Sequence, residues 1–142
     1  MCDIVFLEKD LIYIIHENTL IEFGGEQGNY DYTEDRIESI LAQQYSYFGQ
    51  DKYPSVFKKA AMLLYFLTKG HCFVDGNKRL GIMSAMVFLD LNHYEPTFTN
   101  EDGYNVVMGI SKSNFSGCFR DKYIECLAFW IEKNSVKKQA PF

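Results

Sequence analysis

A short segment of the chain, GHCFVDGNKRLG at residues 70–81, gathers most of the side chains that could do chemistry. It holds a histidine, an aspartate, an asparagine, a lysine and an arginine, and it leads directly into the apolar run IMSAMVFLDL. The apolar run predicts a helix over 77–91, so Lys78 and Arg79 fall in its first turn. Two cations beside the positive end of a helix dipole are unfavourable unless an anion binds there.

The residue types in this turn are those that bind phosphate. Gly76 lets the backbone approach a ligand without a Cβ in the way, and the first backbone N–H groups of the helix, including that of Asn77, are unpaired donors. Lys78 adds a mobile point charge, and Arg79 adds a planar fork of donors. We therefore expect Gly76, Asn77, Lys78 and Arg79 to bind the phosphates of a nucleotide.

Two further side chains of the segment complete a reaction centre. Asp75 beside a polyphosphate indicates a Mg²⁺ ion, which takes carboxylate and phosphate oxygens. His71 is placed to accept a proton from an incoming hydroxyl. Each residue alone also has an ordinary reading: His71 as a structural histidine, Asp75 as a helix cap, and the two cations as a solvated face. One anion site explains them together, and it holds the parts needed for phosphoryl or nucleotidyl transfer.

Helices must position this segment, because apolar residues recur near every 3.6 positions through most of the chain. The pattern predicts an all-α fold, a bundle of about six helices in one domain over 1–134, followed by a polar, frayed tail over 135–142. The 77–91 helix is apolar on nearly every side, which predicts a buried central helix. Thr33, Ser55 and either Asn100 or Asp102 are the expected helix caps. The aromatic segment 46–54 is read as a loop or a short β-hairpin.

Composition narrows the classes of function. The 142 residues are 47% hydrophobic and 23% charged, with a net charge of −5, which argues against direct binding of nucleic acid. The four cysteines show no zinc-ligand spacing, and no signal peptide or membrane-spanning stretch is recognisable. A cytoplasmic protein with reduced thiols and no membrane partner is expected.

The nonapeptide HCFVDGNKR resembles the active-site motif of the Fic/Doc family, which reads HxFx[D/E]GNxRxxR in Fic enzymes and HxFx[N/D]xNKR in the Doc branch. Fic AMP-transferases carry a second arginine three residues after the first, where this chain has Ile82. They also place a small residue where this chain has Lys78. Both departures resemble the Doc branch. The motif positions that match are His71, Phe73, Asp75, Gly76, Asn77, Lys78 and Arg79.

This resemblance implies a toxin that transfers the γ-phosphoryl group of ATP to a Ser/Thr hydroxyl of a protein, which in the Doc branch is elongation factor Tu. It implies His71 as general base, Asp75 as Mg²⁺ ligand, and Lys78 as a second catalytic group that neutralises developing charge. A separate antitoxin protein is the implied partner. AMP transfer at the same site, or a catalytically silent domain that binds a nucleotide or a protein, are the alternatives.

Three features outside the motif are also interpreted. Tyr47, Phe48 and Tyr53 in the aromatic loop are expected to position the target protein as a flap, or else simply to pack over the bundle. The segment TFTNED at 97–102 has the Thr-to-Glu spacing of the inhibitory [S/T]xxxE motif found in many Fic proteins, and we interpret it as a coincidence. His16 is read as an ordinary histidine on a helix face.

Overall fold

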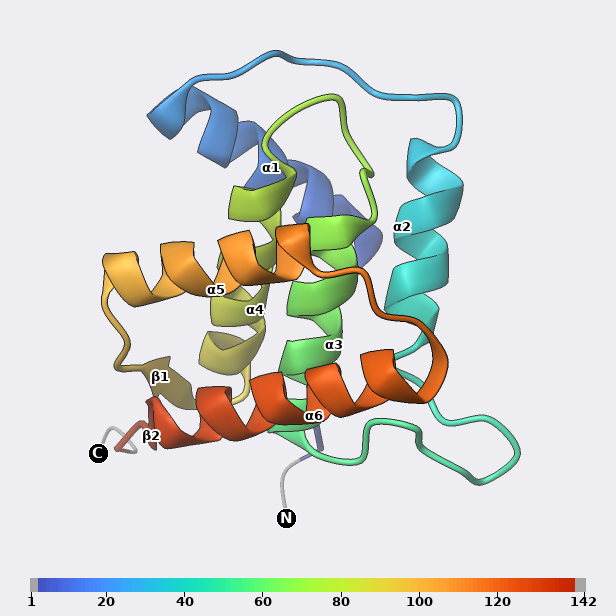
Figure 1. Cartoon of the computed structure of the whole chain (residues 1–142), viewed down its shortest axis with the longest axis vertical. Coiled ribbons are helices and arrows are strands. Elements are labelled where there is room, and N and C mark those ends of the chain that lie inside the picture. The colour runs from blue at the N-terminus through green and yellow to red at the C-terminus, as the bar shows by residue number, and fades with distance from the viewer. Residues whose placement is uncertain (1–2, 140–142) are drawn as a thin grey trace.

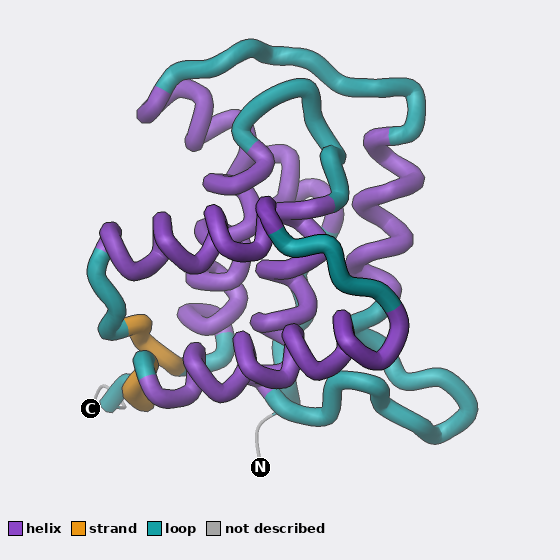
Figure 2. Tube along the Cα trace, viewed as in Figure 1, coloured by secondary structure: helices purple, strands orange, loops and turns teal. Residues whose placement is uncertain are grey.

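The computed structural model describes residues 3–139, and within this range the chain forms a helical bundle with one small antiparallel sheet (Figures 1 and 2). The predicted all-α bundle of about six helices is confirmed. The elements in chain order are α1 (Lys9–Phe23), α2 (Thr33–Ala42), α3 (Val56–Lys69), α4 (Asn77–Leu91), β1 (Tyr94–Pro96), α5 (Asn100–Lys112), α6 (Gly117–Lys133) and β2 (Ser135–Lys137).

Helix α3 is the most deeply buried helix of the bundle. Residues 60–64 on it are completely inaccessible to solvent, and it packs against α2, α4, α5 and α6. The buried central helix was predicted at 77–91, which is α4. That helix packs along α3, but its residues Ile82, Met83 and Met86 are only partly buried because they line a cleft. The apolar character of α4 therefore has two causes, the core on one side and the cleft on the other.

Helices α3 and α4 approach each other closely at Gly81. A Cβ atom added there would lie 3.0 Å from the carbonyl oxygen of Leu64 and would collide with the hydroxyl of Thr68. Glycine is therefore the residue that lets α4 lie directly on α3. This contact fixes where the N-terminus of α4 stands relative to the C-terminus of α3.

The helix starts follow the sequence signals with small shifts. Ser55 caps α3 as predicted, because its hydroxyl accepts a hydrogen bond from the backbone N–H of Lys58 at 3.1 Å. Thr33 was predicted as a cap but is the first helical residue of α2, with Tyr32 before it. Thr99 rather than Asn100 caps α5, and Asp102 completes the capping box.

The chain end is partly ordered by pairing with an earlier segment. Strand β2 pairs antiparallel with β1, with Glu95 opposite Val136. The expectation of a frayed tail from residue 135 is therefore wrong for 135–137, because β1 supplies backbone partners that the sequence pattern did not reveal. Residues 140–142 of the predicted tail lie outside the described range. Among residues 3–139 no helix has the length and hydropathy needed to cross a membrane.

Candidate active site

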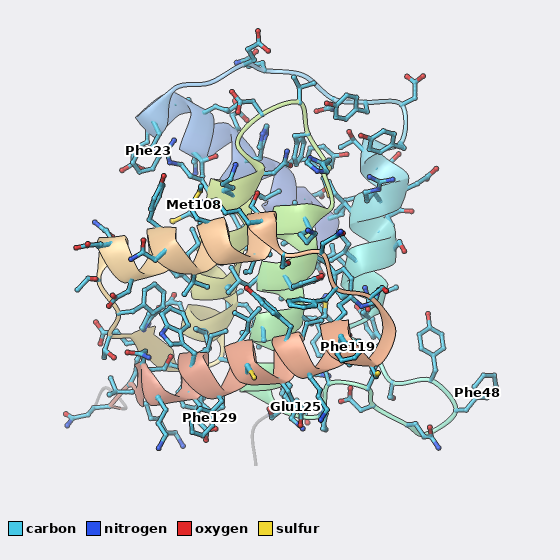
Figure 3. All side chains as sticks on the ribbon, in the orientation of Figure 1. Phe23, Phe48, Met108, Phe119, Glu125 and Phe129 are labelled. Carbon is cyan, nitrogen blue, oxygen red and sulfur yellow. The ribbon has the colours of Figure 1, made fainter. Side chains whose placement is uncertain are left out.

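The motif loop, residues 70–76, joins the buried helix α3 to α4 and borders a cleft of about 970 Å³. The cleft lies between the start of α4, the length of α5 and the end of α1. Figure 3 shows Phe23 of α1 and Met108 of α5 close together on this side of the molecule. The cleft lining includes Phe23, Thr68, His71, Asp75, Gly76, Asn77, Lys78, Arg79, Ile82, Glu101 and Met108.

His71 has an unusual backbone conformation, and its side chain is exposed, whereas those of the next two residues are buried. Its φ of 47° lies in the left-handed region, which costs a residue with a Cβ on the order of 1 kcal/mol or more. Cys72 and Phe73, the next two residues, are 0% and 1% exposed, whereas His71 is exposed and lines the cleft. Phe73 therefore belongs to the core. The ring of His71 has no hydrogen-bond partner within 3–139, so it is available to a ligand.

Cys72 does not compete with His71 as a reactive group. Burial raises the pKa of its thiol to about 11, so the thiolate form is scarce at neutral pH. The thiol is thus part of the core beneath the loop, and His71 is the group of this pair that solvent and ligands can reach.

The first turn of α4 presents backbone donors and cationic side chains to the cleft. Gly76 precedes the helix with φ 82° and ψ 12°, a left-handed conformation that favours glycine. The backbone N–H groups of Asn77, Lys78 and Arg79 have no acceptor within the described chain, and all three residues line the cleft. Their donors, the helix dipole and two exposed cationic side chains therefore meet in the lining of the cleft.

The guanidinium of Arg79 is held over the ring of Phe23, with 4.2 Å between the Cζ atom and the ring centroid. This cation–π contact joins the last residue of α1 to the first turn of α4. It limits the positions that the guanidinium can take, while leaving its N–H donors unpaired among residues 3–139. Arg79 is therefore partly oriented before any ligand arrives.

The side chain of Asn77 is hydrogen-bonded within the motif loop. Its Oδ1 accepts a hydrogen bond from the backbone N–H of Phe73 at 3.1 Å, and its Nδ2 donates to the carbonyl oxygen of Phe73 at 2.8 Å. Both polar groups of the side chain are thus used to close the motif loop. The backbone N–H of Asn77 has no acceptor within 3–139 and is available to a phosphate.

Asp75 is fixed by backbone donors on both sides. Its Oδ2 accepts from Glu26 N–H at 3.0 Å, and its Oδ1 accepts from Gly76 N–H at 2.8 Å. These two hydrogen bonds, with smaller contributions from the charges of His16 and Arg79, lower the pKa of this carboxyl. The group is therefore ionised at neutral pH, exposed, and retains lone pairs that suit a hard cation.

His16, which the sequence indicated only as an ordinary histidine on a helix face, contacts the motif loop from α1. It is 5% exposed, its Nε2 lies 2.7 Å from the carbonyl oxygen of Asp75, and its ring stacks on Phe73 with centroids 3.7 Å apart. A signal was present in the sequence, because His16 falls one turn after Ile12 and one turn before Thr19 on the buried face of α1.

The aromatic loop at 46–54 lies at the wrong end of the molecule to act as a flap over His71. It precedes α3, whereas the motif loop follows it, and the 14 residues of α3 span about 20 Å. Figure 1 shows this loop at the corner of the molecule opposite α1 and the start of α5, and Figure 3 labels Phe48 there. Tyr47 and Phe48 are 63% and 103% exposed, and Tyr53 is buried. The hairpin reading survives as a single bridge between Tyr47 and Gln50.

The segment that does lie beside the motif is the loop between α1 and α2. Asn29 forms an antiparallel bridge with Phe73, and the N–H of Val74 donates to the carbonyl oxygen of Gly28 at 3.1 Å. This loop, rather than 46–54, borders the motif loop. The sequence offered its glycines as a clue to a turn but nothing that paired it with residue 73.

Two other charged residues are placed by the structure. Lys69 donates to the carbonyl oxygen of Ser113 and so joins the end of α3 to the segment after α5. Glu101, the glutamate of the TFTNED segment, lines the cleft, although no ion pair joins it to Arg79 within the described chain.

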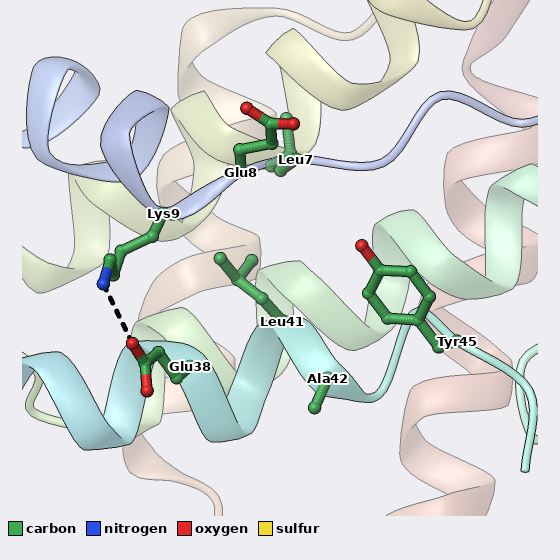
Figure 4. A pocket seen from close by; sticks show the side chains of 7 residues that line it. All are labelled: Leu7, Glu8, Lys9, Glu38, Leu41, Ala42 and Tyr45. Atoms are coloured by element: carbon green, nitrogen blue, oxygen red, sulfur yellow. Dashed lines mark hydrogen bonds and ion pairs between the residues drawn. The ribbon is translucent and has the colours of Figure 1, made fainter.

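A second hollow, of about 330 Å³, lies between the start of α1 and α2 (Figure 4). Its cation, Lys9, is bound by Glu34 at 2.7 Å and Glu38 at 2.9 Å. Because these carboxylates already neutralise Lys9 and raise its pKa, the hollow does not offer an anion the charge found at the start of α4. The large cleft is therefore the better candidate for chemistry.

Comparison with known proteins agrees with the family resemblance of the motif. The model of the Fic/DOC family matches residues 6–89. The chain is 39% identical over 85 residues to "Toxin Doc" of Mycolicibacterium smegmatis, an alignment that covers 56% of this chain and 64% of that protein. It is 30% identical over 86 residues to "Protein kinase doc" of Escherichia phage P1, covering 61% and 67% respectively. The chain thus belongs to the Fic/Doc family and resembles its Doc branch.

Proposed function

We propose that this chain is a Doc-like toxin, a phosphotransferase that moves the γ-phosphoryl group of ATP to a Ser/Thr hydroxyl of a protein. One observation carries the proposal. A single cleft brings together the exposed His71 and the first turn of α4, with its unpaired N–H groups and the side chains of Lys78 and Arg79. Acid–base and anion-binding groups meet there as phosphoryl transfer needs.

The reaction assigns each group a definite task. The ring of His71 takes the proton of the target hydroxyl as its oxygen bonds to the γ-phosphorus. The bond from that phosphorus to the β–γ bridging oxygen breaks, and ADP leaves with the bonding electrons. Lys78 and Arg79, with the N–H groups of the first turn, stabilise the negative charge that accumulates on the phosphate oxygens. The proton stays on His71 until solvent removes it.

Ile82 favours transfer of the terminal phosphate over transfer of AMP. It lines the cleft one turn after Arg79, at the position where the Fic motif has its second arginine. An apolar side chain there removes one cationic clamp from the triphosphate. With that clamp missing, the nucleotide is free to bind in the reverse direction, with its γ-phosphate toward His71. The name of the phage relative, Protein kinase doc, supports the same reaction.

Mg²⁺ fits the proposed site through Asp75. The anchored carboxylate offers hard oxygen ligands beside the anion site. No cluster of three or more His, Cys, Asp or Glu side chains within 3–139 could hold a metal by itself. The ion would therefore bind together with substrate phosphates, where it would supply further charge neutralisation.

The proposed partners follow from the relatives. The name Toxin Doc supports a toxin whose activity is restrained by a separate antitoxin protein. Elongation factor Tu is the candidate target that the Doc resemblance offers. The net charge of −5 gives no support to direct binding of nucleic acid.

Labelled ATP tests this proposal. The purified chain is incubated with elongation factor Tu, Mg²⁺ and ATP labelled at either the γ or the α position. We expect γ-label on the target, no α-label, and a loss of about 10²–10⁴-fold in His71→Ala. His93→Ala is the matched control, because His93 is also exposed with a positive φ, of 70°, but lies outside the cleft lining.

The other outcomes identify the alternatives. Label from the α position would show AMP transfer and would overturn phosphoryl transfer. Binding of ATP without transfer of either label to any protein of a bacterial lysate would indicate the catalytically silent domain. Normal transfer by His71→Ala would reject His71 as the base.

A further inference from the structure

The carbonyl groups of the motif loop are bound by side chains from the start of α2. Arg36 Nη1 donates to Gly70 O at 2.6 Å, Tyr32 Oη donates to His71 O at 3.1 Å, and Thr33 Oγ1 donates to Cys72 O at 2.5 Å. Three consecutive carbonyls, centred on the proposed base, thus each have their own donor. All three donors lie within five residues of the chain.

The three donors also support one another. The guanidinium of Arg36 lies 4.2 Å from the ring centroid of Tyr32, and the ring of Tyr32 stacks on Tyr30 at 4.8 Å. The hydroxyl of Thr33 accepts from Tyr30 N–H at 2.8 Å while it donates to the loop. These contacts orient the donors independently of the loop, so the group is a preformed support rather than a set of separate surface contacts.

The three bonded carbonyls surround the strained residue of the loop, His71. His71 holds φ at 47°, a conformation that a residue with a Cβ keeps only when its surroundings enforce it. Bonding the carbonyls before, at and after His71 fixes the peptide planes on both sides of its Cα atom. That fixes the direction in which the Cα–Cβ bond leaves the backbone, and hence the approach of the imidazole to the cleft.

We propose that Tyr32, Thr33 and Arg36 are positioning residues for His71, which act through the backbone and touch no substrate. This inference rests on the proposed function for its catalytic consequence. None of the three residues lines the cleft, whereas the phosphate donors belong to α4. Loss of the support should therefore lower the rate of transfer while the affinity for ATP is retained.

The test compares two hydroxyl deletions on stacked tyrosines. Tyr32→Phe removes the bond to His71 O, and Tyr30→Phe removes a hydroxyl with no partner within the described chain. Both rings are partly exposed, at 37% and 41%, so both variants should fold. The double variant Tyr32→Phe/Arg36→Met removes two of the three loop donors and the cation–π contact.

Four quantities are measured for each variant: kcat for γ-phosphoryl transfer, KM for ATP, the dissociation constant of ATP with Mg²⁺ by calorimetry, and amide hydrogen exchange of residues 70–75. We expect kcat to fall several-fold in Tyr32→Phe and about 10²-fold in the double variant, with KM and the dissociation constant unchanged and exchange in 70–75 accelerated. Tyr30→Phe should match the wild type.

Transfer by the double variant within twofold of the wild type would overturn the proposal, as would a parallel loss of ATP affinity and kcat. If the wild type transfers no label at all, the proposed function fails on its own. Amide exchange in 70–75 then still decides whether Tyr32 and Arg36 hold the loop. Faster exchange in the double variant would show that they do, and unchanged exchange would overturn the positioning role.

Discussion

His71 and Asp75 stand four residues apart in the motif loop, yet the fold treats them in opposite ways. The ring of His71 is exposed and makes no hydrogen bond within 3–139, whereas both oxygens of Asp75 accept backbone N–H groups. An unbonded ring is suited to exchange protons with a substrate, and an anchored carboxylate is suited to hold a fixed charge. The same seven-residue loop therefore provides one reactive group and one fixed group.

The anchored carboxylate predicts a pH-dependent effect on stability. Backbone N–H groups of Glu26 and Gly76 keep the pKa of Asp75 below its ordinary value of 3.8, so folding favours the charged form. The contribution is present above that ordinary value and is lost as the pH falls through the lower pKa of the folded state. Asp75→Asn should therefore be less stable than the wild type at pH 7, and the difference should shrink toward pH 3.

Urea denaturation at the two pH values measures this difference. Glu125→Gln, a change of an exposed carboxylate on the outer face of α6 (Figure 3), is the control and should show no such pH dependence. A stability difference for Asp75→Asn that is the same at pH 7 and pH 3 would show that the two backbone bonds do not stabilise the charged form.

At the scale of elements, the contact between α3 and α4 places the anion site beside His71. Gly81→Ala would force a methyl group against the Thr68 hydroxyl and the Leu64 carbonyl. We expect a loss of about 1–3 kcal/mol in the free energy of unfolding from this overpacking, measured by urea denaturation. Gly109→Ala on α5 is the control, since its Cβ would come no closer than 3.4 Å to Tyr123 Oη and should stabilise the helix slightly. Equal stability of Gly81→Ala and the wild type would refute the close contact.

The aromatic loop is anchored to α3 by a buried lysine. Lys59 is 1% exposed, and its Nζ donates to both oxygens of Asp51 and to the carbonyl oxygen of Tyr53, at 2.7–2.8 Å. Lys59→Met should cost about 1–3 kcal/mol of stability, because it leaves the Tyr53 carbonyl without its donor, while Asp51 is open enough to regain water.

Transfer activity of Lys59→Met, measured well below its melting temperature, should equal that of the wild type, because the loop lies at the far end of α3. Lys58→Met is the matched control for stability, since Lys58 forms no ion pair within 3–139. A specific loss of transfer in Lys59→Met would restore the idea that the aromatic loop takes part in the reaction.

The six helices were predictable because their signals are local. Apolar periodicity, the Ser55 cap and Gly76 before α4 each act within a few residues of chain. The flap assignment of Tyr47, Phe48 and Tyr53 could also have been rejected from the sequence. A helix as long as α3 necessarily separates a loop before it from a loop after it.

The supporting contacts of the site were not predictable, because they join distant parts of the chain. Tyr32 and Thr33 each bind a carbonyl 39 residues away, and His16 binds one 59 residues away. A weak signal existed in α2, where Thr33 falls on the same buried helical face as Ile37 and Ile40. Polar residues on an inward face indicate a buried polar partner, but the sequence does not say which backbone supplies it.

At the scale of the whole molecule, the fold is a bundle whose centre, α3, presents His71 at one end while α1, α4 and α5 form the cleft around it (Figure 1). The arrangement separates tasks: α4 binds phosphate, the motif loop carries the base, and α1 and α2 hold that loop in place. The lining of the cleft holds cationic groups at the start of α4 and Glu101 on α5 as an anionic group. This asymmetry favours phosphates at the α4 end.

A crystal structure with Mg²⁺ and a non-hydrolysable ATP analogue tests the central claim most directly. The account predicts the triphosphate at the first turn of α4, bound by Arg79 and the backbone N–H groups of residues 77–79, with the γ-phosphate nearest the ring of His71. An analogue bound outside this cleft, or one whose α-phosphate faces His71 while its γ-phosphate points away, would contradict it.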